Sequence, residues 1–485
     1  MPERYENFIG GRWTPPESGT YLHNINPADA RDIVGEFPNS TQADAVNAVD
    51  AAHRAAGDWA ALAGPSRGEY LRKAADILAT RVDEVAADLM REEGKSLPEA
   101  KGETLRGVAL LRYYAAETMR PDGEVIPSAS AATWLMTKRV PLGVVSLITP
   151  WNFPIAIPLW KAAPALAFGN TVVMKPSELA PKTAWNIAKV FEEAGLPAGV
   201  FNVVFGEGTR TGETLTANRK VNGISFTGSV RTGRLIGRTA AEHGKKVQLE
   251  MGGKNAVVVL KDADLTQALT LTIQGAFKSA GEKCTATSRV IVDKKIYAEF
   301  KERLVQRTKA LKLGPGDFAD AYLGPVISSA ARENIIRAVA AAQEEGAELL
   351  CGGKIPEGSL FENGFYIEPA IFDKVTPNMA IAREEVFGPV LCLMEVDGIE
   401  EAVYRLNDTD YGLSASLFTQ NINSAMYFAE RVQAGLIRIN GETAGVEPQA
   451  PFGGMKNSSS YSREQGQAAR DFYTQIKTIS FDRAG

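Results

Sequence analysis

Histidine and cysteine are both scarce in this chain, and each scarcity disfavours a class of chemistry. Only three residues of each type occur among 485. His23, His53 and His243 lie outside any dense polar motif, which disfavours a Cys–His pair of the protease kind and a histidine-rich metal site. Three cysteines form no framework of paired disulfide bridges. We therefore expect a cytoplasmic protein without a metal site.

The charge balance and the apolar runs argue against two kinds of partner. A net charge of -5 does not supply the basic field that nucleic acid requires. Residues 140–160 carry no formal charge, but four prolines in this stretch would repeatedly remove helical hydrogen bonds. We predict a buried strand over 143–149 followed by a rigid loop, and no membrane span. The N-terminus also lacks the apolar core of a signal peptide.

The length and the order of apolar segments predict two α/β domains. Single hydrophobic cores stop growing near about 250–300 residues. A short hairpin is expected at 7–13, and three long helical patterns follow, the clearest over 67–95. From 143 short apolar strands alternate with helical stretches, as in an open, mainly parallel sheet, and a second such run begins after Asn255. Residues 472–481 alternate like an exposed strand that is free to pair with a partner subunit.

Cys284 stands in a setting unlike that of the other two cysteines. It lies in a small, polar, turn-prone segment, GEKCTATS, between a helical stretch and a strand. Cys351 precedes a Gly-Gly turn, and Cys392 lies in an apolar run, where a cysteine behaves as a small hydrophobe. Cys284 is therefore the candidate nucleophile.

Two polar residues at strand ends are candidates to assist the thiol. Glu250 ends an apolar strand against two glycines, and partial desolvation there would raise its pKa into the range of a general base. The alternative is a solvated strand-end glutamate. Asn152, held between aromatics and prolines, could donate to a developing oxyanion, or it could simply cap a turn.

Two glycine-rich turns compete as a phosphate site. The cluster from 206 to 212 is one residue longer than the dinucleotide fingerprint, so its spacing favours an ordinary strand-to-helix turn. The segment FTGSVRTG, 226–233, also joins a strand to a helix, whose first N–H groups can hold a pyrophosphate. On spacing alone, a tight turn and an anion site are equally compatible with the second segment.

Seven short motifs follow one another along the chain: TPWNFP at 149–154, KPSE at 175–178, FTGS at 226–229, LEMGGKN at 249–255, GEKCTATSR at 281–289, EEVFGPV at 384–390 and PFGGMKNSSS at 451–460. Their order and spacing resemble the aldehyde dehydrogenase superfamily over essentially the whole chain. The resemblance implies a Rossmann-type NAD(P)-binding domain (1–122 and 142–252), an α/β catalytic domain (253–456) and small oligomerisation arms (123–141 and 470–485). A homodimer or a homotetramer would follow from such arms.

The same resemblance implies a covalent, hydrolytic mechanism. Cys284 would attack the aldehyde carbon, and the resulting oxyanion would be held by the Asn152 amide and the Cys284 backbone N–H. Hydride would pass to the nicotinamide, and Glu250 would activate the water that hydrolyses the thioester. Glu464 matches a family acid near the active site that helps relay protons. A non-catalytic scaffold or a coenzyme A-acylating enzyme is disfavoured, because the catalytic set is retained.

The cofactor residues follow from the motifs in the same way. The resemblance implies contacts with the adenosine ribose, the pyrophosphate and the nicotinamide ribose from Trp151, Lys175, Ser177, Glu178, Gly228, Ser229, Glu385 and Phe387. A carboxylate at Glu178 accepts from both ribose hydroxyls and repels a 2′-phosphate, so NAD is expected. NADP stays open because this side chain can swing aside.

The segment 435–466 narrows the substrate. It is most similar to bacterial α-ketoglutaric semialdehyde (2,5-dioxovalerate) dehydrogenases, which implies oxidation of that semialdehyde to α-ketoglutarate. The alternatives are an aromatic aldehyde of the vanillin or benzaldehyde type, and succinic semialdehyde. Lys283 and Arg438 are candidate cations for a substrate carboxylate, or surface and structural cations. Aromatic walls are expected from Phe153, Trp160 and Phe452.

Overall fold

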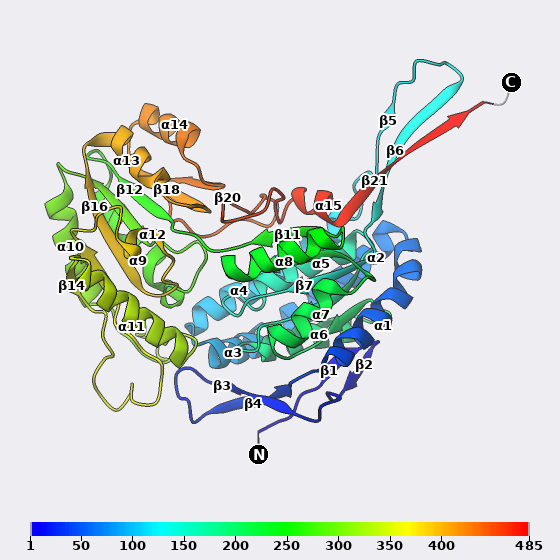
Figure 1. Ribbon diagram of the computed structural model, residues 1–485, viewed down its shortest axis with the longest axis horizontal. Coiled ribbons are helices and arrows are strands. Elements are labelled where there is room, and N and C mark those ends of the chain that lie inside the picture. The colour runs from blue at the N-terminus through cyan, green and yellow to red at the C-terminus, as the bar shows by residue number, and fades with distance from the viewer. Residues whose placement is uncertain (1, 484–485) are drawn as a thin grey trace.

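Two seven-stranded sheets organise the chain, and the computed structural model describes residues 2–483. The strand order is β11-β10-β7-β8-β9-β1-β2 in the first sheet and β14-β15-β16-β13-β12-β18-β19 in the second. Each sheet forms its own lobe together with its helices (Figure 1). The predicted α/β class, with a Rossmann-type sheet and a second α/β unit, is confirmed.

The first sheet combines five parallel strands with an antiparallel hairpin. Buried apolar strands separated by helical crossovers pair in parallel, from β11 through β9. The hairpin expected at 7–13 is present, and Gly10 and Gly11 adopt the positive φ that its tight turn requires. The strands are β1 (Asn7–Ile9), β2 (Arg12–Thr14), β7 (Val144–Ile148), β8 (Thr171–Lys175), β9 (Phe201–Val203), β10 (Val221–Thr227) and β11 (Lys246–Glu250). The helices of this lobe are α1 (Gln42–Ala61), α2 (Gly64–Thr80), α3 (Val82–Glu93), α4 (Leu97–Glu117), α5 (Ala156–Ala167), α6 (Pro181–Glu193), α7 (Glu213–Ala217), α8 (Val230–Glu242) and α15 (Ala468–Tyr473).

The second sheet is parallel except for its edge strand β14. Its strands are β12 (Ala256–Val259), β13 (Arg289–Asp293), β14 (Glu348–Cys351), β15 (Ala370–Asp373), β16 (Val390–Val396), β18 (Ser414–Phe418) and β19 (Leu436–Ile439). Its helices are α9 (Leu265–Phe277), α10 (Tyr297–Lys309), α11 (Ser329–Glu344), α12 (Ala380–Arg383), α13 (Gly398–Asn407) and α14 (Ile422–Arg431). Two short pairs, β3 (Tyr21–Ile25) with β4 (Ile33–Pro38) and β17 (Tyr411–Gly412) with β20 (Met455–Lys456), complete the strands outside the arm.

The N-terminal helical region holds four helices, where three long patterns were predicted. The pattern over 67–95 divides into α2 and α3 at Arg81, whose φ of -109° and ψ of 13° leave the helical range. No glycine or proline marks this break, so the apolar periodicity runs through it without interruption.

The uncharged stretch 140–160 forms β7, a loop and the start of α5. The strand is buried as predicted, but the loop is shorter than expected because α5 already begins at Ala156. Pro158 is tolerated there because it is the third residue of the helix, where N–H groups have no intrahelical partner. Among the described residues, no helix is long and apolar enough to span a membrane.

A three-stranded arm projects from the first lobe (Figure 1). It consists of β5 (Val125–Ile126), β6 (Thr133–Pro141) and β21 (Thr474–Asp482) in the order β21-β6-β5. The expectation of an unpaired C-terminal strand was wrong, since β21 pairs antiparallel with β6 along its full length. Only its outer edge has no strand partner within residues 2–483.

Candidate active site

The first sheet reverses its strand order between β7 and β10, and a cleft opens there. From this point β8 and β9 extend one way and β10 and β11 the other. Open α/β sheets bind ligands at the carboxyl ends of their strands at such a switch point. The cleft has a volume of about 540 Å³ and is lined by residues 150–152, 227–229 and 384–387, together with Cys284. Motifs from both lobes therefore meet in one cavity.

The carboxyl ends of β8 and β10 carry groups suited to binding a dinucleotide. Ser229 is the N-cap of α8, and its hydroxyl accepts from the Thr232 N–H at 3.3 Å. The first N–H groups of this helix, beside Gly228, can receive a pyrophosphate. At the end of β8, Lys175 Nζ lies 3.1 Å from the exposed carboxylate of Glu178. These residues fit the predicted adenosine and phosphate contacts.

Ser177 and the glycine cluster at 206–212 make contacts that shape the backbone near this site. The hydroxyl of Ser177 accepts from the Leu179 N–H at 3.2 Å and so shapes the turn after β8. The glycine cluster forms a turn at Gly206 and a π-helical turn over Gly208–Gly212 beside Lys175. The spacing argument against a dinucleotide fingerprint at this cluster agrees with that geometry.

Glu385 and Phe387 approach the cleft from the second lobe. Glu385 Oε1 accepts from the Gly253 N–H at 3.0 Å. A Cβ at Gly252 would lie 2.0 Å from Glu385 Oε2, so only glycine admits the carboxylate here. Burial raises the pKa of Glu385 to about 7. Phe387 meets Trp151 edge-on, with ring centroids 5.5 Å apart.

Cys284 lies part-buried at the cleft, in a segment that is held by hydrogen bonds and preceded by an unusual backbone conformation. Asn255 Nδ2 donates to the carbonyl of Cys284 at 2.8 Å and to that of Ala286 at 2.9 Å. Just before the cysteine, Ser279 and Ala280 adopt φ values of 52° and 50°, which non-glycine residues rarely do. Burial raises the pKa of the Cys284 thiol to about 12, and the charges of Glu385 and Glu250 add to the shift. The thiol is therefore protonated at neutral pH.

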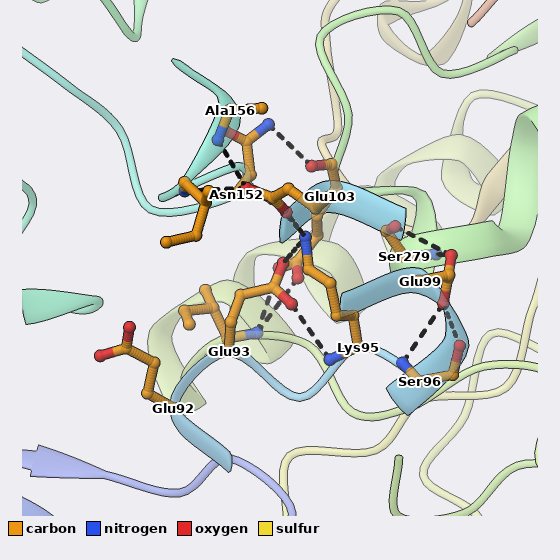
Figure 2. Close-up of polar contacts among 12 residues, drawn as sticks. Glu92, Glu93, Lys95, Ser96, Glu99, Glu103, Asn152, Ala156 and Ser279 are labelled. Atoms are coloured by element: carbon orange, nitrogen blue, oxygen red, sulfur yellow. Dashed lines mark hydrogen bonds and ion pairs between the residues drawn. The ribbon is translucent and has the colours of Figure 1, made fainter. Parts of the chain in front are cut away.

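Asn152 is buried and its amide is oriented toward the cysteine segment. Its Nδ2 donates to the Glu282 carbonyl at 2.9 Å, which leaves its second amide hydrogen for another acceptor. Its backbone carbonyl accepts from Lys95 Nζ at 2.9 Å (Figure 2). Asn152 thus bridges the loop after β7 and the segment that carries Cys284.

Lys95 holds this loop in place, and sequence reasoning missed it. Its ammonium lies 2.7 Å from Glu103 and 3.5 Å from Glu93, and all three side chains are buried (Figure 2). The ammonium also lies 4.4 Å from the centre of the Phe153 ring. Burial raises the pKa of Glu93 to about 8, against the opposing charge of Lys95. No local pattern could signal a contact between Lys95 and Asn152, which are 57 positions apart.

Glu103 extends the same network to the start of α5. Its Oε1 accepts from the N–H groups of Ile155 at 2.9 Å and Ala156 at 3.1 Å. A carboxylate at this position satisfies otherwise unpaired donors and complements the helix dipole. One buried acid on α4 therefore fixes both Lys95 and the helix that follows Asn152.

Glu250 ends β11 as a buried carboxylic group, and its surroundings contradict a solvated strand-end glutamate. Ser459, which the sequence reasoning did not single out, donates its hydroxyl proton to Oε2. The buried Oε1 has no hydrogen-bond partner among residues 2–483. Burial, and then the charge of Glu464, raise the pKa of Glu250 well above its usual range. A carboxylate whose pKa is raised is a stronger base than an ordinary one, which suits proton abstraction.

Glu464 belongs to a buried polar cluster behind Glu250. It forms an ion pair with Lys161 on α5, and both side chains are almost fully buried. Ser225 contacts both of them, at 2.9 Å from the Lys161 ammonium and 3.2 Å from the Glu464 carboxylate. The predicted position of Glu464 near the active site thus agrees with the geometry.

The predicted substrate residues divide into two groups. The aromatic ones lie close together or beside the Asn152 loop: the rings of Trp160 and Phe452 are 5.1 Å apart, and Phe153 packs under Lys95. The two cations have other surroundings. The buried Lys283 ammonium donates to the Gln274 carbonyl at 3.1 Å, and Arg438 is exposed on β19.

Comparison with known proteins agrees with this architecture. The chain matches the aldehyde dehydrogenase family over residues 13–479. It is 54% identical to the α-ketoglutaric semialdehyde dehydrogenase of Bacillus subtilis, covering 98% of this chain and 97% of the relative. It is 42% identical to the α-ketoglutarate semialdehyde dehydrogenase of Haloferax volcanii, over 99% of both chains.

Solved structures give the same result. A betaine aldehyde dehydrogenase from Staphylococcus aureus in complex with NAD+ superimposes with a TM-score of 0.96 at 34% identity, covering 98% of this chain and 94% of the other. An NAD-dependent aldehyde dehydrogenase from Sinorhizobium meliloti gives 0.97 at 36% identity, with 100% and 96% covered. The shared fold, the near-complete coverage and the family match leave one conclusion: this chain belongs to the aldehyde dehydrogenase family.

Proposed function

We propose that this aldehyde dehydrogenase oxidises α-ketoglutaric semialdehyde to α-ketoglutarate, with NAD as the hydride acceptor. The observation that carries the substrate is the 54% identity, over nearly the whole chain, to a protein named for that reaction. Relatives with 42% and 39% identity carry equivalent names. The cleft supports the chemistry, because a thiol, an amide donor and a buried acid surround it or lie next to it.

In the first half of the reaction, Cys284 becomes esterified. Its thiol loses a proton to a nearby base, and the sulfur attacks the aldehyde carbon to form a thiohemiacetal. The free hydrogen of Asn152 Nδ2 and the Cys284 backbone N–H donate to the oxyanion. NAD+, when bound, accepts hydride from that carbon, which leaves a thioester on Cys284.

In the second half, Glu250 supports hydrolysis. Its unpaired Oε1 takes a proton from water, and the resulting hydroxide attacks the thioester carbon. The carbon–sulfur bond breaks, the carboxylic acid leaves, and the Cys284 thiol is restored. Over the whole cycle, one aldehyde, one NAD+ and one water give one carboxylate, one NADH and two protons.

The residues around the cleft fit NAD. Ser229 and the start of α8 would hold the pyrophosphate, and Glu385 the hydroxyls of the nicotinamide ribose. Glu178, exposed beside Lys175, would accept from the hydroxyls of the adenosine ribose and repel a 2′-phosphate. NADP would then bind more weakly than NAD.

The arm of β5, β6 and β21 is proposed to join copies of the chain. Its exposed apolar side chains, Val125, Trp134, Ile476 and Phe481, support an interface there. Light scattering coupled to size exclusion should give the mass of a dimer or a tetramer. A monomer at micromolar concentration would contradict the proposal.

A steady-state panel tests the proposed substrate. α-Ketoglutaric semialdehyde, succinic semialdehyde and benzaldehyde would each be assayed with NAD and with NADP. We expect the highest kcat/KM for α-ketoglutaric semialdehyde with NAD. A higher kcat/KM for benzaldehyde or for succinic semialdehyde would refute the substrate while leaving the family assignment intact.

A further inference from the structure

Arg106 on α4 is a half-buried cation without an acidic partner. Its Nη2 donates to Gln465 Oε1 at 2.9 Å. Within residues 2–483 no carboxylate forms an ion pair with Arg106. The charges of Glu103 and Glu447 act on it only from a longer distance, and they raise its pKa. Burial lowers the pKa of Arg106, which means that its charge is not fully compensated. A partly desolvated guanidinium normally has an anion beside it.

Gln465 places an unused amide donor next to Arg106. This residue is fully buried, with a φ of 60°, and its Nε2 has no hydrogen-bond partner in the described chain. The bond from Arg106 occupies the amide oxygen, so the amide N–H groups are the ones left free. Buried donors without acceptors are rare and costly. A free buried amide beside a half-buried guanidinium is suited to an anionic oxygen.

The pair lies beside the substrate side of the predicted catalytic centre. Gln465 follows Glu464, whose backbone exchanges hydrogen bonds with Phe452 at 2.6 and 2.7 Å. The Phe452 ring packs against Trp160, whose indole N–H also has no hydrogen-bond partner in the described part of the chain. Gly453 follows Phe452 in the chain, and a Cβ at Gly453 would lie 2.9 Å from Glu250 Oε1. Gln465 is therefore connected by short contacts both to the aromatic pair of Phe452 and Trp160 and to the surroundings of Glu250.

Helix packing fixes Arg106 against the same wall. The neighbouring Gly107 is buried, and a Cβ there would meet the side chains of Ile155 and Leu159 at 2.8 Å. This close approach seats α4 on α5, the helix that also carries Trp160. The backbone of Arg106 is therefore held on a rigid element, as a specificity contact requires.

We propose that Arg106 and Gln465 hold the carboxylate of the substrate at the end remote from the aldehyde. The guanidinium and the amide N–H groups donate to the carboxylate oxygens, and the Trp160 indole supplies a further donor. This inference rests on the proposed function, since it needs an aldehyde that carries a carboxylate. Lys283, which already donates to Gln274, and the exposed Arg438 become the rival anchors.

The test compares α-ketoglutaric semialdehyde with butyraldehyde, which has no carboxylate. Arg106→Leu should lower the ratio of their kcat/KM values about 10- to 100-fold, mainly through KM, because a charge-assisted hydrogen bond is lost. Arg106→Lys should lose less. Gln465→Glu places a carboxylate of nearly the same size beside Arg106. The new ion pair should occupy the guanidinium and lower the same ratio, while the packing of the core is kept. Arg112→Leu is the matched control, since Arg112 lies exposed on the same helix, and it should leave the ratio unchanged.

Three results would overturn the anchor. These are equal losses on both aldehydes, an unchanged ratio in Arg106→Leu and Gln465→Glu, or a selective loss found only in Lys283→Met or Arg438→Leu. If the native enzyme itself does not favour α-ketoglutaric semialdehyde, the proposed substrate fails separately. Glutarate inhibition of butyraldehyde oxidation then tests the anchor. Weaker inhibition in Arg106→Leu supports it, and unchanged inhibition refutes it.

Discussion

Replacing Lys95 with methionine should destabilise the protein far more than removing a surface cation. Lys95 and Glu103 form an ion pair with side chains 1% and 2% exposed. Because the pKa of Glu93 is raised to about 8, that acid is largely neutral at pH 7, and Glu103 is the charge that Lys95 compensates. Lys95→Met leaves the Glu103 carboxylate buried and unpaired, which costs about 3–5 kcal/mol. The carbonyl of Asn152 also loses its donor.

A double variant separates the buried charge from the rest of the network. In Lys95→Met/Glu103→Gln no charge remains, while the glutamine oxygen can still accept from Ile155 and Ala156 at the start of α5. We expect this variant to recover more than half of the lost stability. Its kcat should stay below that of the native enzyme, because the loop that carries Asn152 has lost its hydrogen bond from Lys95.

Urea unfolding at pH 7, followed by circular dichroism, measures these differences. Arg72→Met is the control, since Arg72 is exposed and pairs with Glu69 and Asp76 on its own helix. It should cost no more than about 1 kcal/mol. The reasoning fails if Lys95→Met costs as little as Arg72→Met, or if the double variant is no more stable than the single one.

Two further predictions concern groups at the cleft. Because burial raises the pKa of Glu385 from 4.5 to about 7, its carboxylate is ionised above that pH and protonated below it; the KM for NAD should therefore rise as the pH falls from 8 to 6, and Glu385→Gln should give a flat profile. A rising KM in the glutamine variant would implicate another group. Because the pKa of the Cys284 thiol is raised to about 12, alkylation of the free enzyme by iodoacetamide should accelerate about tenfold per pH unit from 7 to 10. A plateau near pH 8.5 would contradict the buried, uncompensated thiol.

The catalytic candidates could be singled out from sequence because each lies in a local pattern, and the family resemblance then chose among the alternatives for Glu250 and Asn152. Cys284 is surrounded by small polar residues, Glu250 ends an apolar strand before two glycines, and Asn152 follows another strand. The alternation of strands and helices likewise predicted the two sheets. Burial of Glu250 was open at that level, because a strand end gives no information about what covers it.

Long-range partners could not be predicted. The contacts of Lys95 with Asn152 and of Ser459 with Glu250 join positions 57 and 209 residues apart. That Arg106 forms no ion pair with a carboxylate of residues 2–483 is recognisable only once its surroundings are known. The break between α2 and α3 could not be predicted either, because the sequence around Arg81 contains no glycine or proline.

The central claim is that Cys284 is acylated and that Glu250 is needed to release the product. Rapid mixing of Glu250→Gln with NAD and α-ketoglutaric semialdehyde, followed by mass spectrometry of the digested protein, tests it most directly. We predict one NADH per active site in a single burst, slow turnover afterwards, and an acyl adduct on the peptide that carries Cys284. Steady turnover at the native rate, or a burst without an adduct on Cys284, would contradict the account.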